Sequence, residues 1–492
     1  MKKKENEIIS EMNSSRRRFI RNVGTAAAGL LVVPYLKPSG VFAYNHKRTS
    51  SYLATVAITN TNPKSGPTPA DSYVYDDASG GVKQKVQYLF DQLGGISDLF
   101  SAGKKVVIKI NLTGGSGYVG NSMLKGVPIT EAMWSHPVVV QAVAQLIIDA
   151  GVTASDITIV DSLGSGDSFS NSAFQGYVDV KNALGCGLVD ISKGTFVNIS
   201  TGSSYFNFPS LTMNQILRDT DVYVSVPKLK QHATAGLTCS LKNQVGATPQ
   251  SSYELPGYTY RRERLHHQAG TDSEWNYLPE TICDLNAARP VHLAVVDGIK
   301  NAKGGEGAWN PNFVPFQSHA LLAGKDPVAT DSIGANVMGL DCEAATLTLP
   351  GPLTDNGVSS TECDNYLYLL NNKGVGTNQL NEIKIVGDGA NLITSVRPNL
   401  DTTQPADFKL CANFPNPFNP STIIVFYLPR NEHVTLKVFD VTGRAIETLV
   451  DGEVPAGEHR LQWSATGLAS GIYLCRMETK DFAETIKMVY QK

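Results

Sequence analysis

The sequence predicts two domains of different class: an α/β domain with a largely parallel sheet, and a C-terminal all-β domain of the immunoglobulin-like sandwich type. Three observations support this division. Buried strands alternate with helical segments over residues 71–397. Short strands separated by Gly, Pro and Asn turns occupy residues 408–492. Residues 398–407 contain two prolines and read as a linker between the two regions.

The first strand–helix–strand unit of the α/β domain is well marked. The apolar run within residues 105–111 predicts a buried strand. Residues 137–150 carry apolar side chains at helical spacing, begin with Pro137 and are followed by Gly151, which is typical of a helix. Residues 157–160 predict the next strand. This order indicates two parallel strands joined by a crossover helix.

Further strands complete both domains. Residues 222–226, 292–296 and 320–323 predict three more buried strands of the α/β domain. Residues 44–70, rich in Ser, Thr, Asn and Pro, are expected to form a flexible segment on the surface. The terminal domain is expected to have strands at residues 422–428, 434–441, 458–463, 471–478 and 484–490.

The composition excludes several classes of protein. The chain is 42% hydrophobic and 18% charged, with a net charge of -3, which argues against a nucleic-acid binder because such proteins need a basic surface. No segment reaches the roughly 18 consecutive apolar residues of a membrane helix, so no permanent span is expected. The seven cysteines form no CxxC pair, so zinc-ribbon and iron–sulfur patterns are absent.

Residues 1–43 resemble a twin-arginine export signal. A basic stretch that contains Arg16 and Arg17 precedes a mildly apolar run, and Val41-Phe42-Ala43 then gives a small-x-small cleavage site that ends at Ala43. The resemblance implies that the twin-arginine translocase carries the folded protein across the inner membrane. An N-terminal anchor that is not cleaved is the alternative.

Polar side chains follow four of the predicted strands. In open parallel sheets, ligands bind at the carboxyl ends of the strands. If residues 228–232 stay extended, three potential cations share one face, because side chains alternate along a strand. Such a face suits a carboxylate or phosphate, with about 1.5–3 kcal/mol for each charge-assisted contact. The candidate site residues at these strand ends and in the following basic element are Lys109, Asn111, Asp161, Lys228, Lys230, His232, Lys242, Asn243 and Asp297.

Several of these residues also have structural explanations. Asp161 and Asp297 precede Ser and Gly, and could make turns or caps instead. Asp326 before Pro327 is explained as a helix N-cap. The glycine-rich residues 114–120 are not followed at once by a helix, so they indicate a loop rather than a dinucleotide cradle. A metal held by the two aspartates and a histidine stays open, without support from the spacing.

Five ordered motifs resemble the family called domain of unknown function 362. They are VVIKINL, HPVVVQAVAQLIIDAG before ITIVDS, PKLKQHATAGLTCSLKNQVG, VVDGIKNAKGGEGAW and LLAGKDPVATDSIGANVMGLD. Many relatives are fused to ferredoxin-type clusters, whereas this chain lacks the cysteine run that such clusters need. The family's recurring polar positions correspond here to the nine residues above and to His136, His266 or His267, Asp326 and Asp331.

The C-terminal region resembles a type A sorting domain of type IX secretion. The motifs are FPNPFNPST, VTLKVFDVTGRAIETLV, GEHRLQW, GLASGIYLCRM and IKMVYQK. The resemblance implies that the type IX machinery exports the protein from the periplasm to the cell surface or the medium. A generic adhesive sandwich is the alternative.

Three functions fit these observations. The first is an exported enzyme for a small anionic substrate, with Asp161 or Asp297 as a base or metal ligand and a lysine of lowered pKa as a second possible base. The second is a non-catalytic surface ligand-binding protein, and the third is a redox protein with a cofactor of unknown kind. For the enzyme, the catalytic candidates are Asp161, Lys228, Lys230, His232, Lys242, Asn243 and Asp297. The substrate-binding candidates are Lys109, Asn111, His136 and His266.

Overall fold

The chain separates into two compact units, with the boundary between Ser395 and Val396. The computed structural model describes residues 53–61, 73–75, 81–116, 123–124, 127–164, 166–255, 262–267, 273–355, 358–393, 408–410, 413, 418, 421–454 and 457–491. The signal residues Arg16, Arg17 and Ala43 and the expected linker 398–407 lie outside the described residues. Each unit is therefore described by itself.

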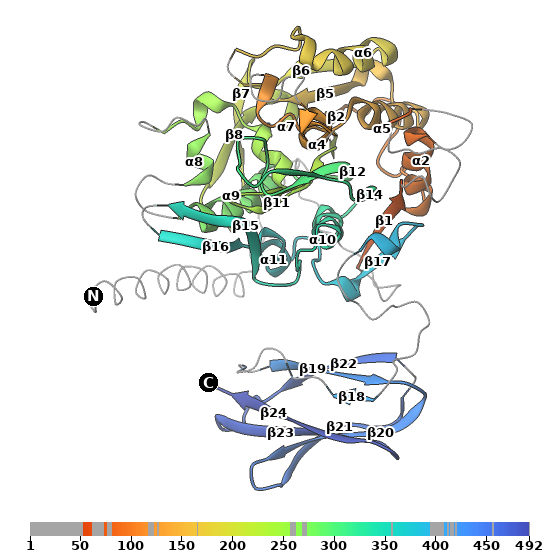
Figure 1. Ribbon diagram of the computed structural model, residues 1–492, viewed down its shortest axis with the longest axis vertical. Coiled ribbons are helices and arrows are strands. Elements are labelled where there is room, and N and C mark those ends of the chain that lie inside the picture. Colours follow the sequence, from red (N-terminus) through yellow and green to blue (C-terminus); the bar gives the residue numbers. More distant parts are fainter. Residues whose placement is uncertain are drawn as a thin grey trace, which may run out of the picture. The chain divides into compact units, whose positions relative to one another are not determined.

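An eleven-stranded sheet forms the centre of the first unit (Figure 1). Every neighbouring pair along its main path is parallel except the two pairs made by β14. This confirms the predicted α/β class with a largely parallel sheet. The path runs through β17 (Ile383–Val386), β1 (Ala54–Asn60), β14 (Ala320–Gly324), β12 (Leu293–Lys303), β9 (Val222–Ser225), β2 (Val106–Lys109), β5 (Ile157–Asp161) and β6 (Gly187–Asp190).

Helices cover both faces of this sheet, which explains why its inner strands are almost wholly apolar. Side chains that alternate along β2 enter two separate cores: Val106 and Ile108 pack on one face, and Val107 packs on the other. The first core also contains residues of α2 (Val82–Gln92), α5 (Pro137–Asp149) and α6 (Gln175–Leu184). The second contains residues of α9 (Glu274–Ala288), α10 (Pro327–Val337) and α11 (Tyr366–Asn372).

The remaining elements lie around this framework. β10 (Lys228–His232) runs parallel to β12 and forms a hairpin with β11 (Gly236–Thr238), which leads into a 3-10 helix, η5 (Lys242–Ala247). The other elements are β3 (Met123–Leu124), β4 (Val127–Pro128), β7 (Phe196–Ser200), β8 (Ser210–Asn214), β13 (Val314–Phe316), β15 (Thr346–Asp355), β16 (Val358–Asp364), α4 (Ile129–Met133), α7 (Gln215–Arg218) and α8 (Glu263–His266).

The expectation that residues 44–70 form a flexible surface segment is wrong for β1. This strand lies inside the sheet, parallel to β17 and antiparallel to β14. Val56, Ala57 and Ile58 are completely buried. The polar residues on both sides of this short apolar run conceal it, because the average composition of the segment is that of a loop.

The second unit is a β-sandwich, as the sequence predicts. One sheet contains β18 (Lys409–Leu410), β19 (Ser421–Leu428) and β22 (Gly457–Ser464). The other contains β21 (Ala445–Val454), β20 (Glu432–Asp440), β23 (Gly471–Glu478) and β24 (Ala483–Tyr490). Its own core includes Phe418, Val438 and Trp463. β21 is a strand that the sequence analysis did not predict.

Two expectations about the whole chain can be compared with the described residues. Within them, no helix is both long and apolar enough to cross a membrane. Six cysteines lie in the described ranges, and all six are buried free thiols. They behave as small apolar side chains of the cores.

Candidate functional site

The residues predicted from the sequence gather at one edge of the central sheet, where β2, β5, β10 and β12 carry polar side chains. The connections diverge at β2: the chain continues through α5 to β5 on one side, whereas β9 pairs with β2 on the other. Open α/β sheets bind ligands at such switch points, because a crevice forms outside the carboxyl ends of the strands.

The first ion pair of this edge joins Lys109 at the end of β2 to Asp161 at the end of β5. Lys109 Nζ lies 2.7 Å from Asp161 Oδ1, and both side chains are buried. The backbone N–H of Leu112 donates to Asp161 Oδ2 at 2.7 Å. Burial lowers the pKa of Lys109, and the carboxylate opposes this shift. Both oxygens of Asp161 are engaged, so this aspartate orients Lys109.

The second ion pair joins Lys228 of β10 to Asp297 of β12. Lys228 Nζ lies 2.6 Å from Asp297 Oδ2, and neither side chain is exposed. Tyr73 donates its hydroxyl to Asp297 Oδ1 at 3.2 Å, and the backbone N–H of His136 donates to Oδ2 at 2.9 Å. Burial lowers the pKa of Lys228 despite its partner, and lowers that of His136 to about 3. His136 is therefore neutral and caps α5.

Lys230 lies on the same strand face as Lys228 but has neutral partners. Its Nζ donates to Asn111 Oδ1 at 3.0 Å and to the Met133 carbonyl at 2.7 Å. Asn111 Nδ2 in turn donates to Asn243 Oδ1 at 3.3 Å, and Asn243 Oδ1 also accepts from Lys109 at 3.2 Å. Burial, together with nearby cations, lowers the pKa of Lys230 well below its ordinary value. One continuous polar network therefore links β2, η5 and β10.

His232 is a neutral donor, which corrects the expectation of three cations on this face. The backbone N–H groups of Thr234 and Ala235 donate to His232 Nδ1 at 3.1 and 3.2 Å. The ring proton therefore resides on Nε2, which lies 3.8 Å from Glu306 Oε2. Burial and the charge of Lys242 lower the pKa of His232 well below its ordinary value.

Lys242 differs from the other lysines of this edge. Among the described residues, its Nζ has neither a hydrogen-bond nor an ion-pair partner, although the residue is only 9% exposed. Burial lowers its pKa to about 8, and the cations Arg262 and Lys109 act in the same direction, while Glu306 and Glu274 oppose it. It is a buried amine that is available to a ligand.

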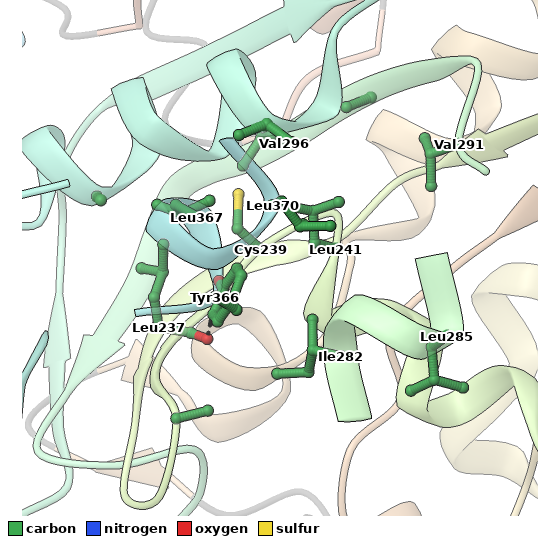
Figure 2. Close-up of a cluster of buried hydrophobic side chains, with 14 of the residues drawn as sticks. Leu237, Cys239, Leu241, Ile282, Leu285, Val291, Val296, Tyr366, Leu367 and Leu370 are labelled. Carbon is green, nitrogen blue, oxygen red and sulfur yellow. Dashed lines mark hydrogen bonds between the residues drawn. The ribbon is translucent and has the colours of Figure 1, made fainter. Parts of the chain in front are cut away.

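The hairpin before Lys242 fixes the position of this amine. Leu237, Cys239 and Leu241 point into the core against α9 and α11, and Tyr366 donates to the Leu237 carbonyl at 3.3 Å (Figure 2). Asp331 of α10 accepts hydrogen bonds from the backbone N–H groups of Ser240 and Leu241, both at 2.9 Å. Asp331 therefore supports the turn rather than the ligand site itself.

Three residues near this edge were not among the sequence-based candidates. Glu306, in the loop after β12, accepts from the backbone N–H of Ala233 at 3.0 Å and faces His232. Arg262 donates from Nε to the Thr248 carbonyl at 3.0 Å and from Nη2 to Ser162. Glu274 pairs with the predicted His266 at 2.6 Å. Glu306 lies within the VVDGIKNAKGGEGAW motif. A single charged residue among glycines in this motif could have identified it as a candidate site residue.

Two further family positions lie outside the network. Asp326 caps α10 by accepting from the backbone N–H of Ala329 at 3.0 Å, as the N-cap explanation predicts. His267 is buried, 3.8 Å from Glu263, directly after the short helix α8.

The donor set favours an anion. In the described part of the chain, no group of three or more His, Cys, Asp or Glu side chains could hold a metal ion. Asp161 and Asp297 are each occupied by a lysine, so they do not converge on a shared ion. Lys242 and Arg262 have no carboxylate partner among the described residues, and side chains of this kind suit a carboxylate or phosphate.

A surface hollow of about 470 Å³ lies elsewhere on this unit. It is found at the amino ends of β2 and β5, where its lining includes Lys105, Ser155, Asp156, Gln215 and Asp219. None of the candidate residues lines it, and the carboxyl edge of a parallel sheet is the usual ligand site. The candidate residues therefore lie apart from this hollow.

Comparisons with known proteins agree with this division of the chain. Residues 106–336 match the model of the domain of unknown function DUF362. The α/β unit belongs to the DUF362 family. Residues 412–491 match the secretion system C-terminal sorting domain. Both family resemblances drawn from the sequence motifs are thereby confirmed, and the sorting domain indicates export to the cell surface or the extracellular space.

A curated relative comes from a different cellular setting. The thylakoid-associated protein sll1697 of Synechocystis sp. is 28% identical over 263 residues, which cover 54% of this chain and 72% of that protein. The DUF362 match begins at β2 and ends within α10, so it includes every candidate site residue. The match excludes β1 and β17, which complete the sheet in this chain. It also excludes Tyr73, which donates a hydrogen bond to Asp297.

Proposed function

We propose that the DUF362 domain of this protein is an exported enzyme that acts on a small carboxylate or phosphate. The observation that supports this most strongly is the surplus of cations at the carboxyl edge of the sheet. Lys242 and Arg262 lack carboxylate partners among the described residues, and they lie at the same edge as the two buried ion pairs. A buried charge without a partner is unfavourable, so an anionic ligand would stabilise this arrangement.

The proposed roles divide the network into a frame and a ligand-facing part. The pairs Lys109–Asp161 and Lys228–Asp297 form the frame, because all four groups are buried and mutually satisfied. Asn111 and Asn243 connect the frame to Lys230. The ligand-facing groups are Lys242, Arg262, His232 and Glu306. Of these, neutral His232 can donate a hydrogen bond from Nε2, and Glu306 places a carboxylate beside it.

Anion binding can be tested by calorimetric titration of the full chain with inorganic phosphate and with succinate. The Lys242→Gln variant should bind the preferred anion at least about tenfold more weakly, because one charge-assisted contact is lost. Lys242→Arg should retain most of the affinity. Lys104→Gln is the matched control, since Lys104 lies on the surface at the opposite edge. Binding that is absent, or equally strong in Lys242→Gln, would contradict the proposed site.

Turnover separates the enzyme from a non-catalytic surface binding protein. A purified chain that binds an anion but converts none of a panel of organic acids and phosphate esters would favour the binding protein. His232→Gln and Glu306→Gln should abolish turnover and leave anion binding within a few-fold of the original.

We also propose that the twin-arginine translocase delivers the chain to the periplasm before the type IX machinery exports it. Replacing Arg16 and Arg17 by lysine should leave the protein in the cytoplasm. Immunoblots of cell fractions would measure this. Normal export of the double variant would exclude this route.

A further inference from the structure

The four lysines at the carboxyl edge differ in how many partners hold their amines. Lys109 donates to Asp161, to Asn243 and to a backbone carbonyl. Lys228 donates to Asp297, to Tyr73 and to a backbone carbonyl. Lys230 has two acceptors and is completely buried. In the described ranges only Lys242 among these four has an amine without a partner, while Asp331 holds the backbone N–H groups of the two preceding residues, Ser240 and Leu241.

We propose that Lys242 forms a Schiff base with the ligand, and that the ligand is a small aldehyde or ketone that carries an anionic group. This inference rests on the proposed anion site and names the chemical class of its substrate. The carbonyl carbon would meet Lys242, while the carboxylate or phosphate of the same molecule would interact with Arg262. Enzymes use such lysines as nucleophiles when the amine is desolvated or lies beside another cation.

The surroundings of Lys242 fulfil both conditions. The side chain is only 9% exposed. Burial and the nearby cations Arg262 and Lys109 lower its pKa to about 8, so a large fraction of the amine is neutral near pH 8. An ordinary lysine, with a pKa of about 10.4, is almost entirely protonated at that pH. A lysine that served only to bind an anion would bind it better in surroundings that keep its pKa high and its amine charged.

Formation of the Schiff base can be written so that every atom and proton is accounted for. Lys242 first loses a proton to solvent, which its pKa of about 8 allows near neutral pH. Nζ then attacks the carbonyl carbon, and a proton moves from nitrogen to the carbonyl oxygen, which gives a carbinolamine. The C–O bond breaks with return of the first proton, and water leaves. The product is a protonated imine, so the overall change is ammonium plus carbonyl to iminium plus water, without any oxidant or reductant.

His232 is suited to assist the loss of water. Its Nδ1 accepts two backbone N–H groups, so the proton is held on Nε2 beside Glu306. A hydrogen bond from this nitrogen can stabilise the hydroxyl as it leaves. The tautomer is fixed by the backbone, which means that the donor is prepared before a ligand binds.

Reductive trapping of the full chain tests the proposal. The protein is incubated with pyruvate, or separately with glyceraldehyde 3-phosphate, in the presence of sodium cyanoborohydride, and intact mass and peptide mapping follow. We expect one covalent adduct per chain, located at Lys242, with one of the two probes. The Lys242→Arg variant should keep the charge and lose the adduct. Propionaldehyde, which lacks the anionic group, should label Lys242 at least about tenfold more slowly, the factor expected for one lost charge-assisted contact.

The outcomes distinguish the two proposals. If neither probe forms an adduct at Lys242 while phosphate or succinate still binds in a Lys242-dependent manner, the Schiff base is excluded and the anion site stands. If no anion binds, the proposed function itself is wrong. Labelling that is equally fast at the surface residue Lys104, or equally fast with propionaldehyde, would show ordinary lysine reactivity and would also overturn the inference.

Discussion

The four lysines at this edge occupy three kinds of environment. Lys109 and Lys228 each have a carboxylate within 2.7 Å. Lys230 has two uncharged acceptors, and Lys242 has no partner within the described ranges. The partners lie 52 and 69 positions away in the chain for Lys109 and Lys228. Spacing along the sequence therefore cannot tell which lysine is structural and which is free to react.

Asp297→Asn should destabilise the α/β unit strongly. It leaves the Lys228 ammonium buried without its carboxylate, and breaking a buried pair in this way costs about 3–5 kcal/mol. Urea unfolding followed by tryptophan fluorescence would measure the change. Asp98→Asn is the control, because it removes an exposed pair with Lys325 and should change stability by less than about 1 kcal/mol. Equal effects of the two substitutions would contradict a structural role for Asp297.

Anion binding should weaken as the pH rises. Lys242 has a pKa lowered to about 8 by burial and neighbouring cations, so its charge is present below that pH and is lost above it. The affinity for phosphate should therefore fall between pH 7 and pH 9.5, by about tenfold for each unit beyond 8 if one proton is linked to binding. Lys242→Arg should bind almost equally over this range, and a parallel fall in that variant would assign the titration to another group.

At the scale of elements, periodicity was informative wherever an element is long or uniformly buried. α5 begins at Pro137 and ends at Asp149, close to the expected limits, because both the apolar spacing and the flanking signals agree. The sequence analysis did not predict β1, because polar residues flank its seven residues on both sides. β10 is extended, as the proposed shared face of Lys228, Lys230 and His232 requires.

The candidate site followed from topology more than from motifs. Parallel strands end at one edge, so the polar residues at the ends of the predicted strands were expected to approach one another. Lys109 and Asp161 do so at the ends of β2 and β5, whereas Asp297 lies inside β12, which continues to Lys303. Glu306 and Arg262 reach the same edge from irregular segments. The positions of these two residues depend on the conformation of their loops, which cannot be predicted from the spacing of apolar residues in the sequence. The tautomer of His232 depends on two backbone N–H groups and its charge state depends on burial, so its sequence neighbours did not reveal either.

Gly246→Ala should weaken the packing of η5 against the first ion pair. A Cβ at this position would lie 2.8 Å from Lys109 Nζ and 3.0 Å from Asp161 Oδ1. Because that pair is buried and cannot move freely, we expect a loss of about 1–3 kcal/mol, the usual range for overpacking. Thermal unfolding would detect it, and the sorting domain in the same sample serves as an internal reference. An unchanged melting temperature would show that η5 adapts.

At the scale of the whole molecule, the two units have separate cores and separate tasks. The sorting domain contains its own apolar cluster, which shares no residue with the two cores of the α/β unit. The ion pairs and the lysines discussed above all belong to the α/β unit. Its chemistry should therefore not depend on whether the sorting domain stays attached.

A chain that ends at Ser395 should retain the fold and the anion affinity of the α/β unit but should not leave the cell. The boundary between the two units lies at this residue. We expect its melting temperature to differ by no more than a few degrees, which corresponds to less than about 1 kcal/mol in a domain of this size. Calorimetry would measure the stability, and culture fractions would show retention in the periplasm. Loss of folding would mean that the sorting domain supports its neighbour.

The position of β1 has a consequence for the order of events during synthesis. This strand is made early, yet its two neighbours, β14 and β17, begin only at residues 320 and 383. The ribosome must therefore complete nearly the entire unit before the interior position of β1 can be filled. Until then the apolar strand has neither of the strands that pair with it in the sheet, and is exposed to aggregation or chaperones. Because the earliest and latest segments close the sheet together, the unit becomes stable only when its chain is complete. This order of events suits the proposed twin-arginine route, which transports folded proteins.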